Sequence, residues 1–125
     1  MFNVVNPYPI DHEELYTFLE SQAPDSVVGL SCDDGACPLA RFLNAQYEGS
    51  TFYVSFTEYR RVMDDVSLGC EADAVLPLDE WAQDFVYLVD ESAQFEEDTP
   101  VSALDALCFL AASCMAHGLL EVQYV

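Results

Sequence analysis

The chain has no lysine, and Arg41, Arg60 and Arg61 are its only fixed cations among 125 residues. Aspartate and glutamate number 23, so the formal net charge is −20 at pH 7. Most carboxylates therefore lack a cationic partner within the chain, and their mutual repulsion costs stability while it attracts cationic partners. A protein that binds nucleic acid directly needs a basic surface, so the sequence excludes that class.

Long apolar runs are also missing. No segment approaches the ~20 apolar residues that a membrane-spanning helix needs, and the N-terminus shows neither the basic nor the apolar region of a secretory signal. The cysteines are odd in number, at Cys32, Cys37, Cys70, Cys108 and Cys114, whereas a secreted disulfide framework pairs evenly. We therefore expect a protein of the reducing cytoplasm, in the producing or an infected cell, with no membrane partner.

Recognisable catalytic motifs are absent too, and the cysteines give only weak metal or thiol patterns. Cys32 and Cys37 stand at the wide edge of zinc-ligand spacing, and no second close pair completes a site; Cys70, Cys114 and His117 are the candidates for a third ligand. Cys37 at a helix start is a candidate reactive thiol, but the neighbouring aspartates oppose a lowered thiol pKa. A zinc- or thiol-dependent enzyme is therefore the third hypothesis.

The two histidines give no clear catalytic pair. His12 falls in a first helical turn among acids and is expected to be solvated, and His117 near a helix end is expected to cap that helix. We expect no enzyme, no metal and no cofactor.

Hydrophobic residues make up 52% of the chain and aromatic residues 13%, which argues against disorder despite the charge. A length of 125 residues suits one domain, 1–125, with one hydrophobic core. The pattern predicts a compact α+β fold of about four helices with a small sheet, with a mostly α fold as the alternative.

Local signals place the elements. Asp11 can cap a helix to about Gln22, and Pro38 suits the first position of a helix to about Tyr47. Alternation predicts a strand over Thr51–Thr57, followed by a loop or turn that holds the two adjacent arginines. Further short strands are possible at Met1–Val5, Val27–Leu30, Val66–Val75 and Leu119–Val125. Thr99 and Pro100 read as the cap and first residue of a last helix to about Ala116, which is apolar nearly all round and is predicted to be the central buried element.

The segment Leu76–Glu91 is the strongest helical pattern. Leu78, Trp81 and Phe85 belong to an apolar stripe at helical spacing, continued by Ala82, Leu88 and Val89. On the opposite face, acids recur three or four residues apart. This segment should bury one face and show water an almost purely negative one.

Three motifs carry a resemblance: Cys37-Pro-Leu-Ala-Arg-Phe-Leu, the Pro-x-x-x-Trp-Ala-Gln-x-Phe-Val-x-x-Val-Asp pattern of residues 77–90, and Thr99-Pro-Val-Ser-Ala-Leu-Asp-Ala-Leu. Together they resemble a loose pattern in short uncharacterised bacterial and phage-type proteins. The matching positions are core and capping residues, so the resemblance implies a shared fold and no activity. In size and charge alone, the chain resembles the nucleic-acid mimics of the anti-restriction and anti-CRISPR classes.

The leading hypothesis is a non-enzymatic nucleic-acid mimic that inhibits a basic DNA- or RNA-binding protein, such as a host defence nuclease complex. Carboxylates would occupy the places of phosphates, and two tyrosines would contact arginine. The alternative is a protein-interaction or oligomerisation module, monomer or homodimer, whose acids only keep it in solution. The predicted contacts are Asp79, Glu80, Asp84, Tyr87, Asp90, Glu91, Glu96, Glu97 and Asp98, with Asp64, Asp65, Glu71, Asp73 and Tyr59 as further candidates.

Overall fold

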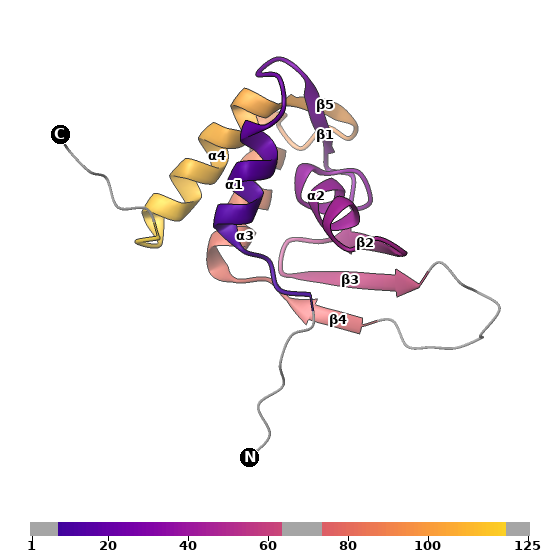
Figure 1. Cartoon of the computed structure of the whole chain (residues 1–125). Coiled ribbons are helices and arrows are strands. Elements are labelled where there is room, and N and C mark those ends of the chain that lie inside the picture. Colours follow the sequence, from indigo (N-terminus) through magenta and orange to yellow (C-terminus); the bar gives the residue numbers. More distant parts are fainter. Residues whose placement is uncertain (1–7, 64–73, 120–125) are drawn as a thin grey trace.

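The computed structural model describes residues 8–63 and 74–119. Within these ranges, four helices combine with two small antiparallel sheets (Figure 1). The elements, in chain order, are α1 (His12–Glu20), β1 (Val27–Ser31), α2 (Pro38–Gln46), β2 (Ser50–Val54), β3 (Glu58–Met63), β4 (Ala74–Pro77), α3 (Glu80–Ser92), β5 (Thr99–Ser102) and α4 (Ala103–Ala116). The predicted α+β class is confirmed, with two small sheets where the sequence suggested one.

Local hydrogen bonds explain where three of the helices begin. The Asp11 side chain accepts a hydrogen bond from the Glu13 N–H at 2.9 Å and caps α1. At α2, Pro38 occupies the first turn, and the Cys37 sulfur accepts the Ala40 N–H at 3.4 Å. These contacts satisfy backbone donors that have no partner inside a helix, so the predicted starts of both helices hold.

The strands β2, β3 and β4 form one antiparallel sheet in that order. The loop or turn predicted around Arg60 and Arg61 is wrong, because both residues lie in β3 and pair with Tyr53 and Phe52 of β2. The sheet accommodates Arg61 because its Nε donates to the Ser50 hydroxyl at 2.6 Å and its guanidinium lies 4.9 Å from the centre of the Tyr8 ring. A cation in an alternating pattern therefore does not mark a turn when the sheet supplies an acceptor and an aromatic face.

The strands β1 and β5 form a separate two-stranded sheet, in which Leu30 pairs with Pro100. The predicted helix start at Thr99 and Pro100 is wrong, since both residues belong to β5. Proline has no N–H to donate, and a two-stranded sheet tolerates it because each strand has a free edge. The helix α4 begins three residues later, where the Ser102 hydroxyl accepts the Asp105 N–H at 3.1 Å.

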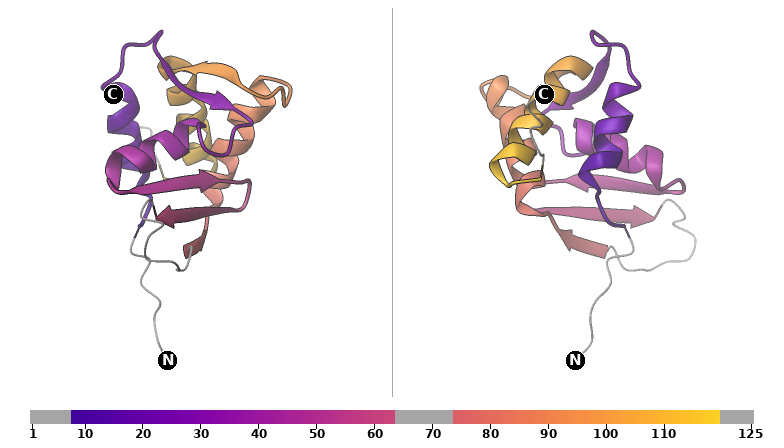
Figure 2. Two further views of the ribbon diagram at one scale, coloured as in Figure 1. Left: turned by 90° about the vertical axis from the view of Figure 1, so that its right-hand side faces the viewer. Right: turned by 60° about the vertical axis from the view of Figure 1, so that its left-hand side comes forward.

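The helices α1 and α3 both pack against α4, which lies between them (Figure 2). The side of these helices that faces the sheets joins α2 and β2 in one core. Its largest fully buried side chains include Tyr59, Phe52, Phe85, Leu15, Leu19, Leu39, Leu43 and Leu110. None of the helices within the described ranges is long and apolar enough to cross a membrane.

The prediction that α4 is the central buried element is wrong for its outer face. Its inner face consists of Ala103, Ala106, Leu110, Ser113 and Cys114, whereas Leu104 and Met115 are 54% and 55% exposed. Small residues on the inner face let α4 approach the core closely, and larger apolar side chains are left on the outside. The strands considered at residues 1–5 and 120–125, and most of 66–75, lie outside the described residues.

Candidate functional site

The outward face of α3 carries the predicted row of acids. Trp81, Phe85 and Val89 are buried with Ala82 and Val86, so the helix can turn only its other side to solvent. The structure confirms the exposure of Glu80, Asp84, Tyr87 and Glu91, which recur three or four residues apart, and of Asp79 at the N-cap. We call these five residues the α3 face.

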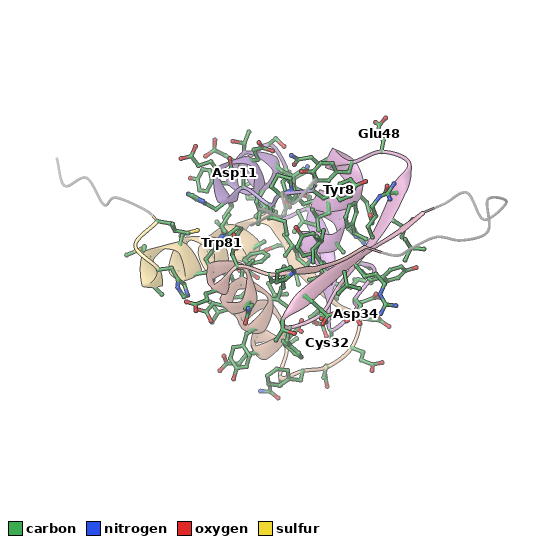
Figure 3. All side chains as sticks on the ribbon, turned by 90° about the horizontal axis from the view of Figure 1, so that it is seen from below. Tyr8, Asp11, Cys32, Asp34, Glu48 and Trp81 are labelled. Carbon is green, nitrogen blue, oxygen red and sulfur yellow. The ribbon has the colours of Figure 1, made fainter. Side chains whose placement is uncertain are left out.

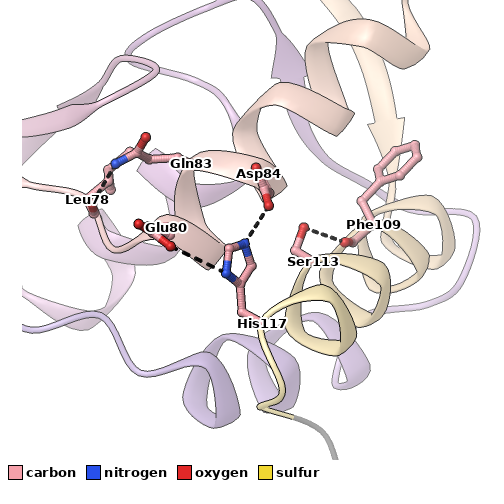
Figure 4. A network of polar contacts seen from close by, with 7 residues as sticks. All are labelled: Leu78, Glu80, Gln83, Asp84, Phe109, Ser113 and His117. Carbon is pink, nitrogen blue, oxygen red and sulfur yellow. Dashed lines mark hydrogen bonds and ion pairs between the residues drawn. The ribbon is translucent and has the colours of Figure 1, made fainter.

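One end of the α3 face meets a histidine (Figure 4). His117 follows the last residue of α4, and its Nε2 lies 2.5 Å from the Asp84 carboxylate. Its Nδ1 lies 3.7 Å from the Glu80 carboxylate. Its own N–H also bonds the Cys114 carbonyl at 3.2 Å, so the predicted capping role holds, while the contact with α3 could not be read from the sequence.

Tyr87 of the α3 face lies near two further aromatic side chains. Tyr87 and Phe95 meet edge to face with ring centres 5.8 Å apart, and Phe56 lies across an open hollow of about 550 Å³. Each of the three is 48% exposed. Aromatic residues at a surface with a charged rim are typical of the centre of a protein interface. Phe56 falls within the strand predicted over Thr51–Thr57, but β2 ends at Val54 and the Phe56 ring is half exposed.

Acids from two distant loops meet near the other end of α3. Asp33 and Asp34 lie between β1 and α2, and Glu97 and Asp98 lie between α3 and β5. We call these four residues the acidic corner. The Asp98 pKa is raised above its ordinary value by the Asp33 side chain nearby, together with slight desolvation and the negative charges of Asp33 and Glu97. The folded chain therefore holds these like charges close together.

The backbone of these loops is strained. Cys32, Gln94, Phe95 and Asp98 have φ values of 54°, 53°, 60° and 58°, all in the left-handed region. None of them is glycine, and side chains in this conformation cost about 1–2 kcal/mol each. Such strain persists only where surrounding contacts over-determine the backbone, and it is concentrated at functional sites.

Buried hydrogen bonds supply that constraint. The Ser31 hydroxyl, fully buried, donates to the Glu96 carbonyl at 2.9 Å. The Cys32 N–H donates to the Asp90 carboxylate at 2.8 Å, and the Asp98 N–H donates to the Ser31 carbonyl at 2.9 Å. The two loops are thus tied to each other and to α3, so the backbone that carries the acidic corner is fixed in place.

Two predicted contact residues are buried and cannot touch a partner. Asp90 is only 6% exposed because its carboxylate turns inward to bind the Cys32 N–H; burial is the main cause that raises its pKa. Tyr59 is 1% exposed and donates its hydroxyl to the Tyr8 carbonyl at 2.7 Å inside the core. Both predictions are wrong, because helical and strand periods give a side chain's direction but not what covers it. The predicted contacts Asp64, Asp65, Glu71 and Asp73 lie outside the described residues.

The remaining predicted contacts are exposed, and the acidic corner adds residues that sequence reasoning missed. Glu96, Glu97 and Asp98 are on the surface as predicted. Asp33 and Asp34 were considered only as neighbours of a thiol, yet the fold brings them to the same corner, and Figure 3 shows Asp34 close to Cys32 and far from Glu48. Only the left-handed turn at Cys32 and its pairing with a loop some sixty residues away bring them together, and no local pattern encodes either.

Cations do not neutralise this surface in the described part of the chain. Within 8–63 and 74–119, the ion pairs closer than 4.0 Å all involve histidine: His12 with Asp11, and His117 with Glu80 and Asp84. The acidic corner takes part in no ion pair of this kind, although Arg60 lines the same hollow as Asp34. Arg61 is engaged with Ser50 and Tyr8 on the three-stranded sheet.

The cysteine chemistry considered above gains no support. Burial raises the pKa of the Cys37 thiol to about 12, and the Cys32 pKa is also raised, by burial and by the Asp90 charge. Both groups therefore remain thiols at neutral pH, which is the unreactive form. Among the residues placed by the structure, no three His, Cys, Asp or Glu side chains form a group that would hold a metal ion.

Comparison with protein-family models, with curated proteins and with solved structures finds no match to this chain.

Proposed function

We propose that the protein is a non-enzymatic nucleic-acid mimic that blocks a basic DNA- or RNA-binding protein. The observation that carries the proposal is the acidic corner: two strained loops, tied together by buried hydrogen bonds, hold Asp33, Glu97 and Asp98 close together. Holding like charges together destabilises the free protein. A cationic partner would remove that cost on binding.

The physical basis of the mimicry is preorganised negative charge. A cleft that binds nucleic acid is lined with Lys and Arg, which are attracted over a distance to a dense row of carboxylates. Because the backbone of the acidic corner is already fixed, little conformational entropy is lost on binding. The α3 face continues the same negative surface along about 17 Å of helix at 1.5 Å rise per residue, from Glu80 to Glu91.

The aromatic side chains fit the same partner. Tyr87 belongs to the α3 face, Phe95 lies between that face and Glu97 of the acidic corner in the chain, and both expose ring surface. An arginine guanidinium binds carboxylates through its N–H groups and stacks on aromatic faces, so the mixed surface suits arginine better than lysine. We infer that the partner is an arginine-containing nucleic-acid site, of the kind found in host defence nuclease complexes.

Competition with nucleic acid tests the proposal. The immobilised protein is exposed to nuclease-treated host lysate, and bound proteins are eluted with excess duplex DNA or with structured RNA. We expect nucleic-acid-binding proteins that elute with competitor and with moderate salt, because both screen or replace the same charges. Proteins that resist both would contradict the mimicry and favour an apolar interface, with acids that only maintain solubility.

A matched pair of variants locates the contact. Glu96→Lys with Glu97→Lys reverses two charges at the loop of the acidic corner, and Asp25→Lys with Glu48→Lys reverses two exposed charges elsewhere. We expect the first pair to reduce capture at least tenfold and the second to reduce it little. Equal losses would show that net charge alone acts and would overturn the proposed site.

A further inference from the structure

The outer face of α4 is an apolar stripe. Leu104, Cys108, Ala112 and Met115 recur at helical spacing and are all exposed, and Leu119 continues the row beyond the helix at 39% exposure. Asp105 is the only charged residue in the 14-residue helix. The stripe lies on the side of α4 away from the core, where Figure 2 shows α4 in front of α1 and α3 in the right-hand view.

Side-chain size on α4 is distributed in the opposite way from an ordinary surface helix. Its buried positions are mostly small, Ala103, Ala106 and Ser113, while large apolar residues such as Leu104 and Met115 face outward. Single exposed leucines are common, but a continuous apolar row along a whole helix marks an interaction surface.

A shallow groove extends the stripe toward α1. It holds about 310 Å³ and is lined by Tyr16 and Thr17 of α1 and by Leu110, Ala111 and Cys114 of α4. Tyr16 is 42% exposed, so its ring forms one apolar wall. An apolar stripe beside a groove between two helices is the shape that accepts an amphipathic helix.

Acids line both sides of this surface. On the α1 side, Glu13 and Glu20 are exposed, and Glu20 lies close enough to Tyr16 to raise the pKa of its hydroxyl. On the α3 side, Glu80, Asp84 and Glu91 belong to the exposed row described above. A second copy of this chain would bring acidic rim against acidic rim, with no lysine to relieve the repulsion, so the charge pattern disfavours self-association.

We propose that the outer face of α4 is the docking site of a basic amphipathic helix in a partner protein. Its apolar side covers Leu104, Cys108 and Met115, and lysines or arginines on its flanks meet the acids of α1 and α3. The helix α4 is about 21 Å long at 1.5 Å rise per residue, so it matches about four turns of the partner helix. This inference shares the acids of the α3 face with the proposed mimic surface, but its apolar contact lies on a different face from the acidic corner, and it does not rest on the proposed mimicry.

In the wild-type protein, the reactivity of Cys108 reports whether a partner covers the outer face of α4. It is exposed at the centre of the stripe, whereas Cys32 is half-buried at the acidic corner. The protein is treated with iodoacetamide, and the alkylation rate of each cysteine is followed by peptide mass spectrometry. The probe is a synthetic amphipathic helix with leucines on one side and lysines on both flanks. We expect it to slow alkylation of Cys108 at least tenfold and to leave Cys32 unchanged.

Two control peptides separate shape from charge. One has the same composition in a scrambled order that disperses the leucines, and the other has glutamate in place of lysine. Neither is expected to protect Cys108. Equal protection by the scrambled peptide would reduce the effect to general charge attraction and would overturn the proposal.

Variants complete the test. Leu104→Gln with Met115→Gln removes the ends of the stripe, while Val27→Gln with Val75→Gln removes comparably exposed side chains, at 51% and 50%, on the sheets. We expect at least tenfold weaker peptide binding in the first pair only, and unchanged binding in Glu96→Lys with Glu97→Lys. Slow alkylation of Cys108 in the free protein, or a dimer in sedimentation experiments that the Leu104 and Met115 changes dissociate, would show another occupant and refute the proposal.

Discussion

At the scale of single residues, the carboxylates in this protein share one environment, with Asp90 and Asp98 as exceptions. Most are exposed and repel one another through water. Asp90 instead lies inside, where its oxygen accepts the Cys32 N–H and fixes a left-handed turn. Asp98 stays at the surface, where the nearby Asp33 side chain raises its pKa.

Replacing Asp90 tests the role of the buried carboxylate. Asp90→Ala leaves the Cys32 N–H without its acceptor, and an unsatisfied buried donor costs about 1–3 kcal/mol in the free energy of unfolding. Asp90→Asn keeps an acceptor oxygen and removes a charge whose pKa burial has raised, so we expect stability at or above that of the wild type at neutral pH. Urea denaturation measures both. Equal destabilisation by the two changes would contradict the assigned role of the hydrogen bond.

Replacing Asp98 tests its contact with Asp33 through the pH dependence of stability. Its pKa is raised in the folded state, so its favourable contribution is present when the group is protonated, below its ordinary pKa, and is lost as pH rises through the raised value. Asp98→Asn donates to Asp33 at every pH, and asparagine tolerates a φ of 58°. We expect a higher urea midpoint than wild type at neutral pH and convergence of the two in acid. Asp25→Asn, with the same charge change, should gain less; an equal gain would argue against the Asp33 contact.

At the scale of elements, the close approach of α2 to β1 depends on Gly29. A Cβ at this position would lie 2.4 Å from the Pro38 nitrogen and 2.7 Å from the Cys37 carbonyl carbon, both backbone atoms that cannot move aside alone. Since β1 carries the loop with Asp33 and Asp34, the same contact positions the acidic corner.

Gly29→Ala should therefore destabilise the protein by about 3 kcal/mol, the upper range for overpacking. Val27→Ala, at an exposed position of the same strand, should change the unfolding free energy by no more than about 0.5 kcal/mol. Thermal unfolding followed by circular dichroism gives both values. A small effect at Gly29 would mean that β1 and α2 separate easily.

The two faces of α4 should respond differently to mutation. Leu110 is 1% exposed, so Leu110→Ala should cost about 2–5 kcal/mol. Leu104→Gln and Met115→Gln lie on the outer face and should each change stability by at most about 0.5 kcal/mol. A large loss at either outer position would show that the face is covered in the free protein.

At the scale of the whole molecule, a net charge of −20 opposes folding. Raising monovalent salt shortens the range of the repulsion, from ~30 Å at 0.01 M to ~3 Å at 1 M. We expect the urea midpoint to rise steadily with NaCl and equally with KCl, since screening does not depend on the cation. The Asp25→Lys and Glu48→Lys double variant should gain less from salt. A midpoint that is independent of salt would show that the charges are too well separated to matter.

The sequence by itself determined the elements whose cause is local. Side-chain period and caps were enough to place α1, α2 and the exposed row of α3, because a helix needs only its own backbone hydrogen bonds and one covered face. The lack of lysine led to the expectation that the protein does not bind nucleic acid directly. A residue pattern that is compatible with two kinds of element gave a wrong prediction. Thr99 and Pro100 suit a helix start and an edge strand alike, and they belong to a strand.

Only the tertiary structure decided what covers each side chain. The hydrogen bond from Ser31 to Glu96 joins residues 65 positions apart, and it creates an acidic corner that neither loop encodes alone. In the same way, packing put Asp90 and Tyr59 inside and left the large side chains of α4 outside. Periodicity gives the direction of a side chain from its own element, whereas burial depends on which distant segments the fold brings against it.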